Sequence, residues 1–169
     1  MDIGKFIDEY VNFKSEQARD ALVAKHVVAT FVPYETKIAE AKNIVENSCY
    51  VEVDGKKKFW LNTPIRYILF IKTIITLYTD LEFDTTNILL QINLLEQYQI
   101  IEPIIAKIGP DYQKFQTILN MTLDDTMANE RSLISYLENL EESIGVVLDS
   151  LSKLSQEQAD AYKELLESN

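Results

Sequence analysis

Hydrophobic residues recur along most of this chain every three or four positions, which is the spacing of one face of an α-helix. In the stretch 61–84, LNTPIRYILFIKTIITLYTDLEFD, apolar side chains cover nearly the whole girth between residues 65 and 78. Thr63 is a typical N-cap, and Pro64 suits the first helical position because its missing N–H costs nothing there. A helix that is apolar nearly all round is a buried one, so we predict a central core helix over residues 64–79. Contact of one side of this helix with another subunit is the alternative.

Three amphipathic helices are expected before this segment. The first has one apolar face, formed by Ile3, Phe6, Ile7, Tyr10 and Val11. Ser15 is a candidate cap for the second helix, and Pro33 opens the third. In the third helix the predicted apolar stripe consists of Tyr34, Ile38, Ala41 and Val45. The charged side chains between them are predicted to face water: Glu35, Lys37, Glu40 and Lys42.

Further helices are expected after the central segment. One is capped by Asp84, Thr85 or Thr86 and turns a face inward that contains Ile88, Leu89, Ile92 and Leu95. A short turn over 103–109 and another helix follow. The inner side of that helix is predicted to contain Tyr112, Phe115, Ile118, Leu119 and Thr122.

The most regular pattern lies near the C-terminal end. Apolar residues alternate there at spacings of four and three, which is a heptad seam: Leu133, Leu137, Leu140, Ile144, Val147, Leu151 and Leu154. We expect a helix over about 130–153 whose seam packs against other helices of the chain, with self-association as the alternative. The sequence SQEQ at 155–158 is a capping box and predicts the start of a final helix.

One segment, CYVEVDGKKKFWL at 49–61, predicts a β-hairpin. Asp54-Gly55 favours a two-residue type I′ turn, which would place Val53 opposite Lys56 and Tyr50 opposite Phe59. The hairpin carries both basic and aromatic side chains, and we take these as candidate partner-binding residues: Tyr50, Lys56, Lys57, Lys58, Phe59 and Trp60. Alternatively, the lysines only protect an edge strand from aggregation, and the aromatic rings only cover the helices.

Composition supports one mainly helical domain. The chain has 169 residues, 47% of them apolar and 25% charged, with only 4 Gly and 4 Pro. This length fits a single domain over 1–169, and the shortage of Gly and Pro argues against a large all-β fold. We therefore expect a compact multi-helix bundle with one small β-hairpin.

The sequence contains few residues suited to catalysis or to metal binding. The single histidine, His26, has no second His or Cys nearby in sequence, and the single cysteine, Cys49, reads as a small buried apolar side chain. The sequence contains no P-loop, no G-x-S-x-G and no H-E-x-x-H motif. We therefore expect no catalytic, metal-binding or cofactor-binding residues, and a protein that is not an enzyme.

The charge balance narrows the possible partners. There are 16 basic and 27 acidic residues, a net charge of −11, and residues 101–169 alone hold 5 basic and 13 acidic residues. A net acidic surface repels phosphate, so direct binding of nucleic acid is not expected. The apolar part of 61–84 is too short and too polar to cross a membrane, and the first residues resemble no secretion signal. One cysteine fits a reducing cytoplasm.

Three stretches of the chain, about a third of it, carry a family resemblance: FVPYETKIAEAKNIVENS, LNTPIRYILFIKTIITLYTDLEFD and LDDTMANERSLISYLE. They resemble uncharacterised small helical proteins encoded by tailed bacteriophages of low-GC Gram-positive bacteria. The resemblance implies a phage context and no functional residues. We expect a non-enzymatic protein–protein interaction protein, a virion assembly or structural component that binds itself or other phage proteins in the host cytoplasm or the virion. The alternative is an acidic inhibitor of a host defence protein or a nucleic-acid-binding protein.

Overall fold

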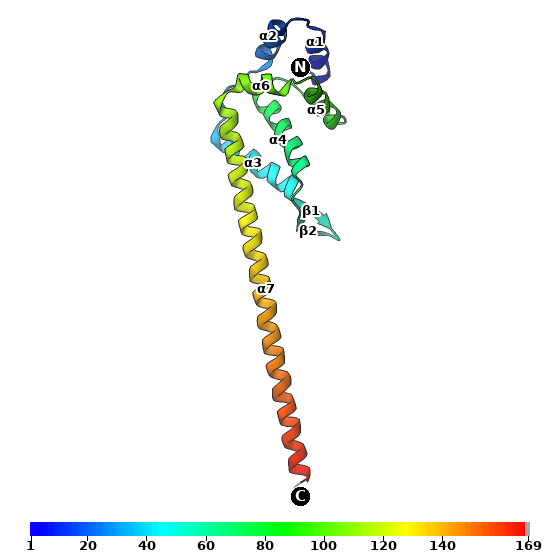
Figure 1. Cartoon of the computed structure of the whole chain (residues 1–169), viewed down its shortest axis with the longest axis vertical. Helices are drawn as coiled ribbons and strands as arrows, with labels where there is room; N and C mark the ends of the chain where they lie inside the picture. Colours follow the sequence, from blue (N-terminus) through cyan, green and yellow to red (C-terminus); the bar gives the residue numbers. More distant parts are fainter. Residues whose placement is uncertain (168–169) are drawn as a thin grey trace. The chain divides into compact units, whose positions relative to one another are not determined.

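The computed structural model describes the backbone of residues 1–167, and the side chains of residues 1–134 with a part of those from 136 to 152. The described residues form helices and one two-stranded antiparallel sheet (Figure 1). The elements are α1 (Ile3–Asn12), α2 (Glu16–His26), α3 (Tyr34–Cys49), β1 (Tyr50–Val53), β2 (Lys56–Phe59), α4 (Thr63–Tyr78), α5 (Ile88–Gln97), α6 (Ile101–Ile108) and α7 (Pro110–Glu167). The prediction of a mainly helical fold with one hairpin is confirmed.

Contacts between residues divide the chain into two units, Met1–Asp124 and a second unit that begins at Asp125. The first unit contains α1 to α6, the hairpin and the first fifteen residues of α7. The prediction of one domain over 1–169 stays a prediction.

Helix α4 lies in the core of the first unit, as its sequence predicts. Its buried side chains are Phe70, Ile71, Ile74, Ile75 and Tyr78. The N-terminal half is more exposed than expected, because Ile65 and Tyr67 reach solvent. The cap also differs by one position: Asn62 Oδ1 accepts the backbone N–H of Ile65 at 3.1 Å, and Thr63 is the first helical residue. α4 packs mainly against α3, and also contacts α5.

The other predicted faces are right in most positions. α1 buries Ile3, Phe6, Ile7 and Tyr10, and Ser15 caps α2 by accepting the N–H of Ala18. Two residues that were expected inside are exposed, Val11 on α1 and Leu89 on α5. α5 buries Gln91 in addition to Ile92 and Leu95, because the amide oxygen of Gln91 accepts the N–H of Asp84 at the preceding turn.

The predicted face of α3 is right at Ala41 and Val45 but wrong at three other positions. Tyr34 and Ile38 are exposed, whereas Lys37, which was expected in water, is completely buried. The buried side of α3 consists of Lys37, Ala41, Ile44, Val45, Ser48 and Cys49. The reason is a buried partner for the lysine, Asp111, which lies 74 positions further along the chain.

Helix α7 is one continuous helix, so two predicted boundaries are wrong. The backbone is helical from Pro110 to Glu167 and passes through residues 130 and 155–158 without a break. The SQEQ sequence therefore lies inside a helix and does not begin one. Gly109, with φ of 72°, ends α6 directly before α7 begins. Of the residues predicted on the inner side of α7, Phe115 and Leu119 are buried, together with Leu123.

Candidate functional site

A buried ion pair joins three elements of the first unit. Lys37 Nζ on α3 donates to Asp111 Oδ1 at 2.6 Å, and both side chains are at most 4% exposed. The second carboxylate oxygen of Asp111 accepts the backbone N–H of Val32 at 3.0 Å and the hydroxyl of Tyr78 at 2.8 Å. Asp111 is the second residue of α7, where the helix dipole favours a negative charge.

These contacts shift the pKa values of Asp111 and Tyr78. Burial raises the pKa of Asp111, but the hydrogen bonds from Lys37, Val32 and Tyr78 lower it more, so it lies below the usual 3.8. Burial and the hydrogen bond to Asp111 both raise the pKa of Tyr78. The charges are thus satisfied inside the fold, and the cluster explains how α3, α4 and α7 are joined. It offers no group aimed at a substrate.

The single histidine also has a carboxylate partner. His26 Nδ1 lies 2.7 Å from Asp80 Oδ1, and this contact lowers the pKa of Asp80. The ring is 5% exposed and meets the edge of Phe6, and its Nε2 atom is enclosed without a hydrogen-bond partner in the structure. This arrangement holds the segment after α4 against α2. Among the described residues, no group of three His, Cys, Asp or Glu could bind a metal ion.

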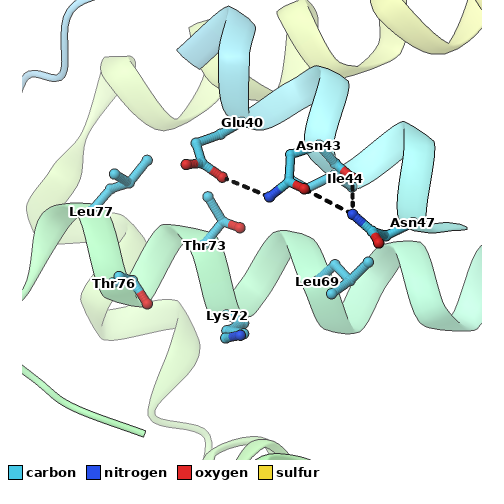
Figure 2. Close-up of a pocket in the computed structure, with 9 residues that line it drawn as sticks. All are labelled: Glu40, Asn43, Ile44, Asn47, Leu69, Lys72, Thr73, Thr76 and Leu77. Atoms are coloured by element: carbon cyan, nitrogen blue, oxygen red, sulfur yellow. Dashed lines mark hydrogen bonds between the residues drawn. The ribbon is translucent and has the colours of Figure 1, made fainter. Parts of the chain in front are cut away.

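A shallow groove lies between α3 and α4 (Figure 2). Asn43 and Glu40 from α3 and Lys72 and Thr73 from α4 line it, and Asn43 donates to Glu40 at 3.4 Å. Its volume is about 180 Å³, whereas pockets for small organic ligands usually measure about 300–1,000 Å³. The groove is therefore too small for an ordinary cofactor.

The hairpin has the register that its turn predicts. Tyr50 pairs with Phe59, Val51 with Lys58 and Val53 with Lys56. Asp54 and Gly55 form the loop with φ of 53° and 72°, as a type I′ turn requires. The backbone pairing continues one step further, because the N–H of Trp60 donates to the carbonyl of Cys49 at 2.8 Å. In Figure 1 the hairpin connects the end of α3 to the start of α4.

The six candidate residues of the hairpin divide between its two faces, because side chains alternate along a strand. On one face Tyr50 meets Phe59 edge to face at 5.6 Å, and Lys57 lies over the Tyr50 ring at 4.7 Å and pairs with Glu46 of α3. By this alternation Lys56, Lys58 and Trp60 share the other face, and all three are exposed, Trp60 by 66%. Their role in binding a partner stays a prediction.

A second exposed apolar surface lies on α7. We call it the α7 stripe, and it consists of Leu133, Ile134, Tyr136, Leu137, Leu140, Ile144 and Leu148, which are 44–64% exposed. The seam residues among them were expected to pack internally, and this expectation is wrong for Leu133, Leu137, Leu140 and Ile144. Val147, Leu151 and Leu154 lie outside the described side chains. The 4-3 spacing was the signal for this surface, and internal packing of the seam was preferred to its exposure.

No helix of the described residues combines the length and apolar character needed to span a membrane. Comparison with known proteins adds no assignment: no family model matches the chain, no curated protein matches its sequence and no solved structure matches its fold.

Proposed function

We propose that this chain is a non-enzymatic protein–protein interaction protein whose main binding surface is the α7 stripe. The observation that carries the proposal is the exposure of seven large apolar side chains between residues 133 and 148. Single exposed apolar residues are normal on a protein surface, but a contiguous apolar face indicates an interaction site. The buried cluster of Lys37, Asp111 and Tyr78, in contrast, has its hydrogen bonds satisfied within the fold, and its role is to stabilise the fold.

The resemblance to small phage proteins suggests a more specific role. In that context, the proposed function is assembly or structure of a virion, with the first unit as the folded body and the part of α7 that carries the stripe as the assembly element. The exposed face of the hairpin that contains Lys56, Lys58 and Trp60 is a second candidate contact for another phage protein.

A second function is favoured by the distribution of charge. Residues 101–169 contribute −8 of the net charge of −11. An acidic helical segment of this kind suits an inhibitor that occupies the basic groove of a host defence protein or a nucleic-acid-binding protein.

Affinity purification from infected cells tests these proposals. The bait is the full chain, wild type or Leu140→Asp, and the matched control is Leu89→Asp, which makes the same change at an exposed leucine outside the stripe. We expect Leu140→Asp to lose proteins that wild type and Leu89→Asp both retain. Virion proteins among those lost favour assembly, and a host nuclease or sensor favours inhibition. An identical set of bound proteins for all three baits, with an untagged copy of this chain counted among them, contradicts the proposed role of the stripe.

A further inference from the structure

We propose that the α7 stripe binds the same stripe of a second copy of this chain and forms a homo-oligomeric coiled coil. This inference rests on the proposed function, because it names the partner of the surface assigned there.

The positions of the stripe residues fit a coiled coil. With Leu133 and Leu140 at heptad position d, Leu137 and Ile144 fall at position a, which are the positions that interlock between helices. The remaining stripe residues flank this seam: Ile134 and Leu148 at e, and Tyr136 at g. Every stripe residue therefore lies on the side of α7 that would face a partner helix. An apolar face that includes e and g is wider than the seam of a minimal two-helix coil.

The charges decide between a second copy and a basic partner helix. Positions e and g flank the seam and set partner choice through charge. Between residues 134 and 148 these positions hold Ile134, Tyr136, Glu141, Ser143 and Leu148, so only one of five is acidic. The other acids in and directly after this segment occupy positions b and f in the sequence: Glu138, Glu142 and Asp149. Two copies can therefore meet without a row of facing acids, whereas a basic helix would find little acid beside the seam.

Burial of the stripe against a partner helix would also stabilise α7. An isolated helix in water gains little from its own backbone and depends on burial of its apolar face. α7 carries Gly145 within this segment, which lowers helix propensity by about 1 kcal/mol relative to alanine. The stripe from Leu133 to Leu148 extends over about 22 Å at the usual rise of 1.5 Å per residue. Burial of this length of apolar face against a second copy would add to the stability of the helix.

Sedimentation of the full chain tests the inference. We expect wild type at micromolar concentration to sediment with at least twice the monomer mass of 19.5 kDa and to dissociate on dilution. Leu140→Asp places a charge at position d, so its association should be weaker by about 100-fold or more. Leu89→Asp should behave as wild type. Circular dichroism establishes that each variant is folded, and Ile144→Asn, which places a milder polar group at position a, provides a second disruption if Leu140→Asp misfolds.

The outcomes separate this inference from the proposed function. A wild-type chain that is monomeric throughout the concentration range overturns the homo-oligomer, as does an oligomer that both stripe variants leave intact. If the wild type is monomeric but its stripe still determines which other proteins are captured, the proposed function stands and only the identity of the partner is wrong. If the stripe variants change neither the sedimentation of the chain nor the set of captured proteins, both the homo-oligomer and the proposed function are wrong.

Discussion

Lys37 and Asp111 lie 74 positions apart in the sequence, and their side chains form an ion pair of 2.6 Å that is almost completely shielded from water. A buried charge whose partner is removed costs about 3–5 kcal/mol, because the remaining charge has lost its compensation. We therefore expect Asp111→Ala to lower the free energy of unfolding by about that amount, with Lys37, Val32 and Tyr78 all losing a bond. Urea denaturation measures the change.

The control for this experiment is an ion pair on the surface. Lys107 Nζ lies 2.8 Å from Asp20 Oδ2, and both side chains are at least one-third exposed. Exposed pairs contribute about 0–1 kcal/mol, so Asp20→Ala should have a small effect. Equal losses for Asp111→Ala and Asp20→Ala would show that the buried cluster does not stabilise the fold as described.

Helix α4 should tolerate little loss of volume at its buried positions. Ile71 and Ile74 are each 1% exposed. Replacement of either by alanine should destabilise the protein by about 2–5 kcal/mol, since it removes apolar contacts and leaves a cavity. Thermal melting followed by circular dichroism is the measurement, and Leu89→Ala, at an exposed position, is the control. Melting curves that match wild type for both core variants would contradict the placement of α4 in the core.

Acidification should weaken the contact between His26 and Asp80. The folded pKa of Asp80 lies below its ordinary value of 3.8, with the hydrogen bond to His26 as the largest cause. A carboxylate of this kind stabilises the fold above the unfolded pKa, and its contribution is lost as the pH falls through the folded pKa. We expect the stability difference between wild type and Asp80→Asn to be present at about pH 5 and to shrink toward about pH 3.

A partner variant checks the cause of this pH dependence. His26→Phe removes the same hydrogen bond from the other side and should reduce the pH dependence of stability in the same interval. If Asp80→Asn and His26→Phe both retain the wild-type pH dependence, the contact between the two residues does not produce it.

The three lysines of the hairpin should contribute little to folding. Lys57 pairs with Glu46, but both side chains are more than half exposed. Replacement of Lys56, Lys57 and Lys58 together by serine should therefore change stability by about 1 kcal/mol or less. If the hairpin binds an acidic partner, the same variant should bind more weakly, with less dependence on salt. Undiminished binding at low salt would exclude the lysines as a contact.

Replacement by alanine should have opposite effects on stability at two glycines. A Cβ at Gly145 meets nothing within 4 Å, and the backbone there is helical. Gly145→Ala should therefore increase helicity and add up to about 1 kcal/mol of stability. Gly55 also has free space, but its φ of +72° strains any other side chain, so Gly55→Ala should destabilise. Circular dichroism at increasing urea compares the two, and a loss of helicity in Gly145→Ala would contradict the helical assignment at that position.

Local signals predicted the hairpin and the core of α4 because each depends on neighbouring residues alone. Asp54-Gly55 leaves only two residues for the loop, and this length determines the pairing of Tyr50 with Phe59. Because α4 is apolar on nearly every side, it was expected to be buried whichever side faces the core. Ile71, Ile74 and Tyr78 are buried as expected.

Long-range and competing effects explain the wrong predictions. Periodicity assigned Lys37 to solvent, because nothing near it in the sequence indicates that Asp111 would neutralise it in the core. The capping box at 155–158 is a local signal for a helix start, but a residue that can cap can also continue a helix already formed. The 4-3 spacing located the stripe around Leu137 and Leu140, but spacing alone does not distinguish a seam within one chain from a seam between chains.

Cys49 is the only cysteine in the sequence, and its side chain is completely buried at the C-terminal end of α3. A thiol reagent can modify it only after the surrounding part of the first unit has opened, so the rate of labelling reports local unfolding. Labelling of Cys49 in the native chain therefore measures how fast this unit opens. Thiol labelling would thus report the opening of the first unit and sedimentation would report assembly, both on the same protein and without an engineered probe.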